Sequence, residues 1–178
     1  MNNNSKGLQA FLLAPLTNQK NMARNIIYSL LLLCTFSACN DSDDDAKDMT
    51  YPQILSEGLD VTPVDCQQFS RGEILPVCFQ LSDDIELGSY NIEIHNNFDH
   101  HTHSTSSADC PMDPQKQPEH PWVYNQDFSI PNGLQTFNAK HEIAIPTDID
   151  PGDYHFMIRL TDHAGWQQLH AVAIKIID

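Results

Sequence analysis

The stretch "DIDPGDYHFMIRLTDHAGW" (residues 148–166) decides the fold class of this chain. A Pro-Gly turn signal at residues 151–152 comes directly before Tyr154, and every second residue from there to Leu160 is apolar. This period is typical of a β-strand with one buried face. A tyrosine just after the turn resembles a tyrosine corner. The Thr-Asp-x-x-Gly pattern at residues 161–165 predicts a hairpin turn, so the stretch reads as a strand between two turns.

The rest of the chain after Cys39 shows similar short runs and no helical period. β-Branched and aromatic segments alternate with Pro, Gly, Asn and Asp. They predict strands at residues 73–81, 89–95, 126–130, 141–145, 153–161 and 168–176, with an edge strand at 51–55. Six or seven short strands indicate an all-β fold, an immunoglobulin-like antiparallel β-sandwich of about seven strands. Another all-β barrel or a jelly roll is the alternative.

Two of these strands are expected to be neighbours. In an immunoglobulin-like domain, residues 89–95 and 153–161 correspond to strands C and F, which pair antiparallel in one sheet. The period of two puts His95 on the outward face of the first strand and His155 on the outward face of the second. The end of one strand then lies beside the start of the other. We therefore expect His95 near His155.

The stretch "HNNFDHHTHSTSS" (residues 95–107) begins at this point and is rich in histidine. Zinc and copper are held by neutral imidazole nitrogens, often with a carboxylate as a further ligand or as a group that orients a ring. We predict a transition-metal site, zinc first and copper second. The candidate ligands are His95, His101, His103 and His155, followed by His100 and Asp99. The alternative is a polar surface loop that happens to contain histidines.

The beginning of the chain predicts export. Residues 1–38 read as a signal peptide, with an apolar run at 26–38 that is short for a membrane span, and Met22 is a possible true start. Small residues precede Cys39, as in the lipobox of bacterial lipoproteins. Residues 39–50 would form a lipidated acidic tether, and residues 51–178 the sandwich domain. An ordinary signal peptide followed by a plain linker is the alternative.

Charge and cysteines narrow the function further. The predicted leader contains three of the nine basic residues and no acidic residue, so 6 basic and 24 acidic residues remain, a formal charge of −18. Such a surface repels nucleic acid. In an oxidising compartment we expect a disulfide between Cys66 and Cys110, which lie in polar turn-rich segments. Cys78 lies in an apolar run, where a buried free cysteine is common.

Other functions find less support. No nucleophile elbow or phosphate loop is present, so we expect no enzyme, with a hydrolytic zinc centre as the exception to consider. A surface module that binds glycans or proteins is the main alternative, with Trp122, Tyr124 and Trp166 as stacking residues. Haem capture by a histidine is a third possibility. His120 could fold over the metal site, whereas His141, His163 and His170 are expected to be structural or to lie in turns.

Three segments, "DIELGSYNIEIHNNFDHHTHS", "VYNQDFSIP" and "GDYHFMIRLTDHAGWQQ", resemble a family of small Bacteroidetes lipoproteins of unknown function. The resemblance covers most of residues 51–176. It implies an immunoglobulin-like fold and an envelope location, but no activity. The acidic Ser-Asp-Asp-Asp run at residues 42–45 resembles the signal that sends such lipoproteins to the outer face of the outer membrane; a periplasmic location is the alternative. The expected partners are a metal ion and an outer-membrane uptake receptor.

Overall fold

The computed structural model describes residues 47–58, 60–102 and 110–178, and all regular secondary structure in these ranges is β. Residues Asp48–Asp178 form one compact unit. The expected all-β sandwich is confirmed, with eight strands where about seven were expected. Their bounds are β1 Gln53–Leu55, β2 Gln67–Ser70, β3 Ile74–Ser82, β4 Leu87–Asn96, β5 Tyr124–Ser129, β6 Thr136–Ala144, β7 Gly152–Asp162 and β8 Gln167–Ile177. The expected leader and Cys39 lie outside the described residues.

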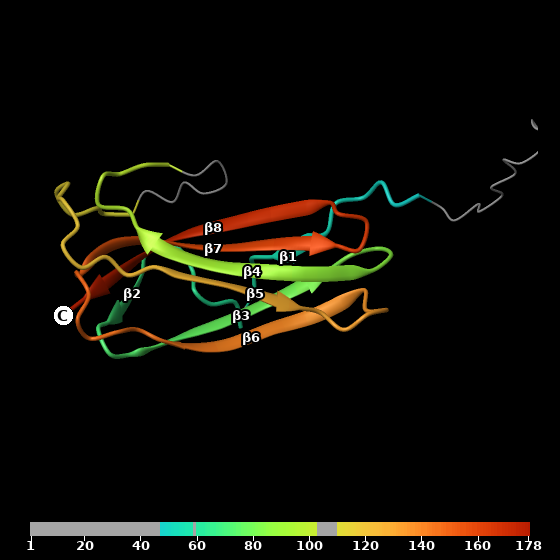
Figure 1. The fold of residues 1–178 in the computed structure, drawn as a ribbon, viewed down its shortest axis with the longest axis horizontal. Helices are drawn as coiled ribbons and strands as arrows, with labels where there is room; N and C mark the ends of the chain where they lie inside the picture. Colours follow the sequence, from blue (N-terminus) through green and yellow to red (C-terminus); the bar gives the residue numbers. More distant parts are fainter. Residues whose placement is uncertain (1–46, 59, 103–109) are drawn as a thin grey trace, which may run out of the picture. The chain divides into compact units, whose positions relative to one another are not determined.

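The strands form two sheets that pack as two layers (Figure 1). One sheet has the order β1-β3-β6, and the other has the order β2-β8-β7-β4-β5. The inward residues of both sheets make a common core, because alternate side chains are apolar along most strands. Phe79 of β3 stacks on Phe156 of β7 across this core, with ring centroids 5.8 Å apart. Both side chains are completely buried.

The tyrosine corner that the sequence predicted is present at the start of β7. The Tyr154 hydroxyl donates a hydrogen bond of 2.7 Å to the carbonyl of Asp150, four residues upstream. The same hydroxyl accepts a hydrogen bond of 3.3 Å from the backbone N–H of Trp122. Burial raises the pKa of this phenol above its usual value. Tyr154 therefore joins two loops at one end of the sandwich.

The hairpin turn between β7 and β8 also forms. Asp162 closes it from both ends: its backbone N–H donates to the carbonyl of Trp166 at 3.0 Å, and its side chain accepts from the Trp166 N–H at 2.8 Å. Gly165 has φ of 96°, a conformation that L-residues with a side chain rarely adopt. The Thr-Asp-x-x-Gly pattern thus has a local physical cause.

One strand was missed by the sequence analysis. β2 pairs in parallel with β8, although only four residues long. It follows Cys66, which forms a disulfide with Cys110. This is the pair that we expected. Cys78 is free, but the expectation that it is buried was wrong: it is partly exposed, because it lies on the outward face of β3.

The long loop between β4 and β5 is called the covering loop below, and its described residues are 97–102 and 110–123. It covers one end of the five-stranded sheet. Asp153, His155 and Met157 point away from the core, yet all three are buried. The loop is held there by backbone contacts, such as the Asn97 N–H to the carbonyl of Asp153 at 2.7 Å, and by the Asp113 N–H to the Asp153 carboxylate at 2.7 Å. The outward face of β7 is therefore a second buried layer at this end.

Candidate metal centre

His95 and His155 lie directly opposite each other on the paired strands β4 and β7. Eight residue pairs, from Ser89 with Thr161 to Asn96 with Tyr154, hold this antiparallel register, and Ile94 pairs with Phe156 on the core side. Because side chains alternate between the faces of a strand, the two histidines share the outward face. Their ring centroids are 5.6 Å apart, with an interplanar angle of 62°. The expected juxtaposition of these two residues is thus present in the structure.

His101 is the third histidine at this place. Its ring stacks on that of His95, with centroids 5.3 Å apart and an interplanar angle of 15°. Its centroid lies 5.1 Å from that of His155. The three side chains His95, His101 and His155 are called the histidine cluster below. Two of its members come from rigid strands, and the third comes from the covering loop.

The nitrogens of His95 and His101 face each other. Their Nε2 atoms are 3.2 Å apart. Two nitrogens bound tetrahedrally to one zinc ion at about 2.0–2.1 Å would lie roughly 3.3–3.4 Å from each other. The observed separation is therefore compatible with two ligands of one ion.

Carboxylates next to the opposite ring nitrogens favour the ligand tautomer. Asp99 Oδ1 is 2.6 Å from Nδ1 of His101, and Glu93 Oε1 is 3.1 Å from Nδ1 of His95. An ionised carboxylate favours a proton on the nitrogen beside it, which leaves a lone pair on Nε2 of a neutral ring. Two nitrogens that each carry a lone pair would then lie 3.2 Å apart. That arrangement is unfavourable without a cation and suitable with one.

His155 is the buried member of the cluster. Its Nε2 is 3.2 Å from the carbonyl oxygen of His101. A carbonyl can only accept, so this contact favours a proton on Nε2 and a lone pair on Nδ1. The contact also fixes the backbone of the covering loop at His101. His155 is therefore suited to position the loop, and its ring lies beside those of His95 and His101.

Burial changes across the cluster. His155 is 7% exposed, whereas the His101 side chain is 37% exposed. Burial lowers the pKa of His95 below its usual value, and the opposing effect of Glu93 is smaller. The hydrogen bond with His101 lowers the pKa of Asp99. A neutral His95 and an ionised Asp99 are the states that metal binding requires.

The other three predicted ligands, His100, His103 and Asp99, are not members of the histidine cluster. The His100 ring does not join the cluster: its Nε2 lies 2.9 Å from the carbonyl oxygen of Asp113. His103 lies outside the described residues, so its role as a ligand stays a prediction. Asp99 lies beside His101 and suits the orienting role. Glu93 was not among the predicted site residues, although its i−2 position places it on the same face of β4 as His95.

Four further histidines lie away from the cluster. His120 is exposed, and its backbone pairs with Asp150. His163 is exposed in the hairpin turn. His141 contacts Tyr90, with 2.6 Å between its Nε2 and the hydroxyl oxygen, and His170 contacts Phe79, with ring centroids 5.7 Å apart. His141 and His170 are thus structural, as expected.

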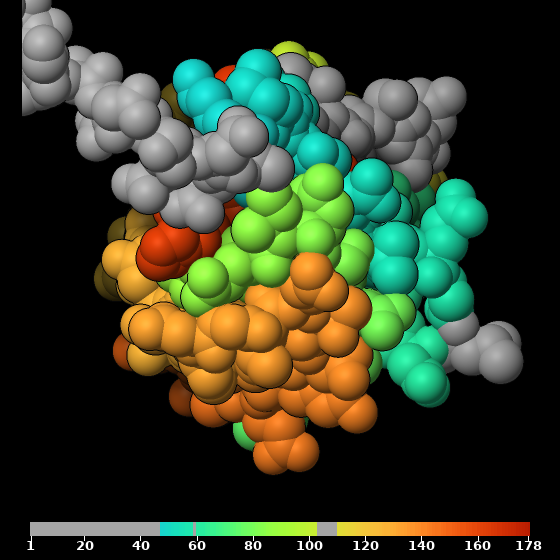
Figure 2. Space-filling model, turned by 90° about the vertical axis from the view of Figure 1, so that its right-hand side faces the viewer, coloured from blue at the N-terminus to red at the C-terminus, as the bar shows by residue number. Residues whose placement is uncertain are grey.

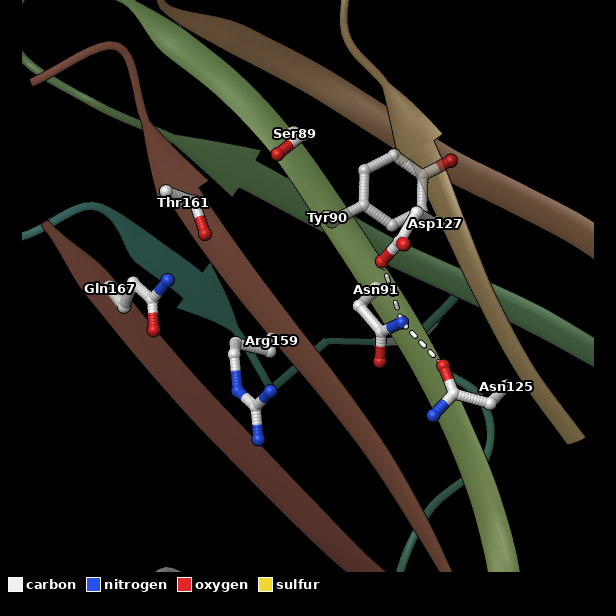
Figure 3. Close-up of a pocket in the computed structure, with 8 residues that line it drawn as sticks. All are labelled: Ser89, Tyr90, Asn91, Asn125, Asp127, Arg159, Thr161 and Gln167. Carbon is white, nitrogen blue, oxygen red and sulfur yellow. Dashed lines mark hydrogen bonds between the residues drawn. The ribbon is translucent and has the colours of Figure 1, made fainter. Parts of the chain in front are cut away.

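The aromatic side chains do not form a stacking surface around Trp122. Trp122 is 6% exposed and packs with Tyr154, their ring centroids 6.3 Å apart. A polar hollow lies instead on the outward face of the five-stranded sheet (Figure 3). There Asn91 donates hydrogen bonds of 2.8 Å to both Asn125 and Asp127, and Arg159 and Gln167 stand on the neighbouring strands.

Comparison with known proteins identifies the family but no activity. The crystal structure of the sporulation control protein Spo0M from Bacillus subtilis is similar with a TM-score of 0.38 and 10% sequence identity, over 72% of this chain and 49% of that chain. The chain thus spans about half the length of that protein. No curated protein matches the chain. Within the described residues, no helix has the length and apolar character needed to cross a membrane. Residues 37–177 match the domain of unknown function DUF4625, and the chain therefore belongs to the DUF4625 family.

Proposed function

We propose that this protein is an envelope lipoprotein that binds one transition-metal ion, zinc first and copper second, between His95, His101 and His155. Its role is to capture or deliver the ion, and it performs no chemistry on a substrate. The observation that carries the proposal is the 3.2 Å separation of the His95 and His101 Nε2 atoms, with the His155 ring 5.1 and 5.6 Å from their rings. Three imidazoles with flanking carboxylates form a donor set that zinc and copper favour.

The access to the cluster supports capture or delivery over a purely structural ion. The His101 side chain is 37% exposed, so an ion or a partner protein can reach this ligand, whereas His155 is buried. Three protein ligands also leave a fourth position of a tetrahedral ion open. A partner protein, such as an outer-membrane uptake receptor, could supply a ligand there.

The envelope location rests on the sequence. Cys39 follows an apolar segment and precedes the acidic run at residues 42–45. If Cys39 carries the lipid, labelled palmitate should be incorporated into the wild-type chain in cells and lost in Cys39→Ser. Protease added to intact cells should degrade a surface-exposed protein and spare a periplasmic one. Equal labelling of the two chains would contradict the lipid anchor.

Metal loading tests the site directly. The full chain, purified without a histidine tag, is dialysed against zinc and its metal content is measured. We expect one zinc per chain for the wild type and less than a tenth of that for His95→Gln/His101→Gln. The control is His120→Gln/His163→Gln, which removes two exposed histidines and should load like the wild type. A wild type without stoichiometric metal, or a double cluster variant that loads fully, would contradict the proposal.

The adhesive alternative has a separate test. Trp122 offers no exposed ring, and the polar hollow of Figure 3 is the candidate surface for a glycan. Binding on a glycan array that survives a chelator and is lost in Arg159→Ala would favour that alternative. Binding that is absent in both chains would leave the metal proposal as the better account.

A further inference from the structure

A second set of possible ligands lies at the opposite end of the sandwich. Three carboxylates, those of Asp48, Asp83 and Asp162, each offer an oxygen, and these oxygens all lie within 4.8 Å of one another. They come from three separate segments: the one before β1, the loop after β3 and the last residue of β7. We call them the acidic triad. Figure 2 looks onto this end, where the segment before β1 (cyan) lies against the β3–β4 loop (green).

Backbone amides hold each carboxylate in place through one oxygen. Asp83 Oδ1 accepts from the N–H groups of Ile85 and Glu86, at 2.9 and 2.8 Å. Asp162 Oδ1 accepts from Trp166, and Asp48 Oδ1 accepts from the Thr50 N–H at 3.0 Å. These bonds fix the orientation of the three side chains.

The second oxygens are the unusual part of the triad. Oδ2 of Asp162 and Oδ2 of Asp83 are both buried, and neither has a hydrogen-bond donor within the described part of the chain. Asp162 is only 3% exposed. A buried carboxylate oxygen without a donor is costly, because the charge loses its hydration and gains nothing in return. The carboxylates of the triad also repel each other, because each has an oxygen within 4.8 Å of the others.

Among the residues that the structure describes, no basic side chain forms an ion pair with the triad. The ion pairs of the described residues involve Arg71, Lys175, His95 and His101, and none of them reaches the triad. Strands β4 and β7 nevertheless approach each other closely at Asp162. A Cβ added to Gly88 would lie 2.7 Å from the Asp162 carbonyl oxygen, so glycine is needed there for this approach. The packing therefore holds three acidic groups together where a cation would relieve their repulsion.

We infer that the acidic triad binds a calcium ion. The donors are all oxygens, which hard cations prefer, whereas zinc and copper favour the nitrogens of the histidine cluster. Calcium takes 6–8 oxygen ligands in flexible geometry and suits carboxylates from three independent segments. Magnesium demands near-octahedral geometry and keeps most of its water, so it suits this set less.

The site is independent of the histidine cluster. Asp162 follows His155 by seven positions in β7, which is roughly 23 Å at about 3.3 Å per residue. Calcium at the triad would join the segment before β1 to the β3–β4 loop and the β7–β8 turn. The ion would thus fasten the start of the folded unit, at Asp48, to the body of the sandwich.

Terbium luminescence tests the site, because terbium substitutes for calcium and is excited through a nearby indole. The Trp166 Nε1–H donates to the carbonyl of Asp48 at 3.1 Å, so this indole is adjacent to the triad. Terbium added to the full chain should give sensitised emission that calcium chloride displaces. Asp83→Asn and Asp162→Asn should weaken binding of both ions at least tenfold. Calcium should also raise the Tm of the wild type but not of these variants.

The controls separate the two sites. Asp127→Asn removes an exposed carboxylate from the polar hollow and should bind like the wild type. Trp166→Phe should lose most of the emission but keep the Tm increase. If Asp83→Asn or Asp162→Asn fails to fold, Asp48→Asn replaces it, because Asp48 lies before the first strand. This variant should show the same loss of terbium and calcium binding. His95→Gln/His101→Gln should keep calcium binding, and Asp83→Asn should keep zinc loading. No effect of millimolar calcium on the Tm, or an equal effect in Asp48→Asn, would overturn the inference.

Discussion

At the scale of single residues, the backbone torsion at His100 sends its side chain to a different place from that of His101. His100 has φ of 60°, in the left-handed region. Its ring therefore turns to the carbonyl of Asp113, while Asp99 and His101 meet each other on the other side of the turn. Residue types and spacing do not reveal this torsion. For that reason the sequence could rank His101 ahead of His100 but could not place the His100 ring at Asp113.

Asp99 should matter for metal affinity although it need not touch the ion. Asp99→Asn removes the charge that favours a proton on Nδ1 of His101, and such orienting groups are worth about 10–100-fold in metal affinity. Asp99 is exposed, so the free energy of unfolding should change little. Zinc titration against a competing chelator measures the affinity. An unchanged affinity would show that the carboxylate does not orient the ring.

Two histidines away from the site should make stability depend on pH. Burial lowers the pKa of His141 and of His170 in the folded protein. As the pH falls below about 6.5, the unfolded chain binds protons first. The free energy of unfolding should therefore fall between pH 7.5 and 5.5.

Urea unfolding in chelator at the two pH values measures this. His170→Gln should reduce the difference between them, while His163→Gln, in the exposed turn, should leave it unchanged. Stability that is equal at both pH values, or greater at pH 5.5, would contradict the burial argument.

At the scale of strands and turns, alternation and turn signals carried most of the prediction. They placed seven of the eight strands to within a few residues at most ends. His95 was placed beside His155 because the face followed from alternation and the pairing followed from the expected immunoglobulin-like fold. β2 was missed, since four residues paired in parallel with β8 leave no alternation long enough to detect. The covering loop was missed too, because its position depends on long-range contacts such as that between Asp113 and Asp153.

The tyrosine corner gives a prediction at this scale. Tyr154→Phe removes the bond to the Asp150 carbonyl and leaves the buried Trp122 N–H without its acceptor. The loss should be about 1–3 kcal/mol in the free energy of unfolding. The matched control is Tyr124→Phe, whose hydroxyl bonds to Gln126 on the exposed face. Urea unfolding of the two variants should separate them, and equal small losses would argue against the corner.

At the scale of the whole domain, the two ends of the sandwich carry different groups of candidate ligands. One end carries the histidine cluster under the covering loop, and the other carries the acidic triad at the turns. The disulfide Cys66–Cys110 ties the covering loop to the segment before β2 across a sequence separation of 44. The loop that bears His101 is thus restrained by covalent chemistry at one side and by β4 at the other.

Loss of this disulfide should affect the whole domain. Cys66→Ala/Cys110→Ala should reduce the free energy of unfolding by about 2–4 kcal/mol, because the unfolded chain regains the entropy of a long loop. Cys78→Ala is the control, since that thiol is free. Urea unfolding without reductant measures both. A double variant as stable as the control would mean that the disulfide contributes nothing to the domain.

The central claim is that one ion sits between three named histidines, and anomalous diffraction tests it most directly. Crystals of the zinc-loaded protein would be measured above and below the zinc absorption edge. We predict one strong anomalous peak about 2.0–2.1 Å from nitrogens of His95, His101 and His155. Peaks confined to other carboxylates or histidines, or no peak at the cluster in a protein with zinc in solution, would contradict the account.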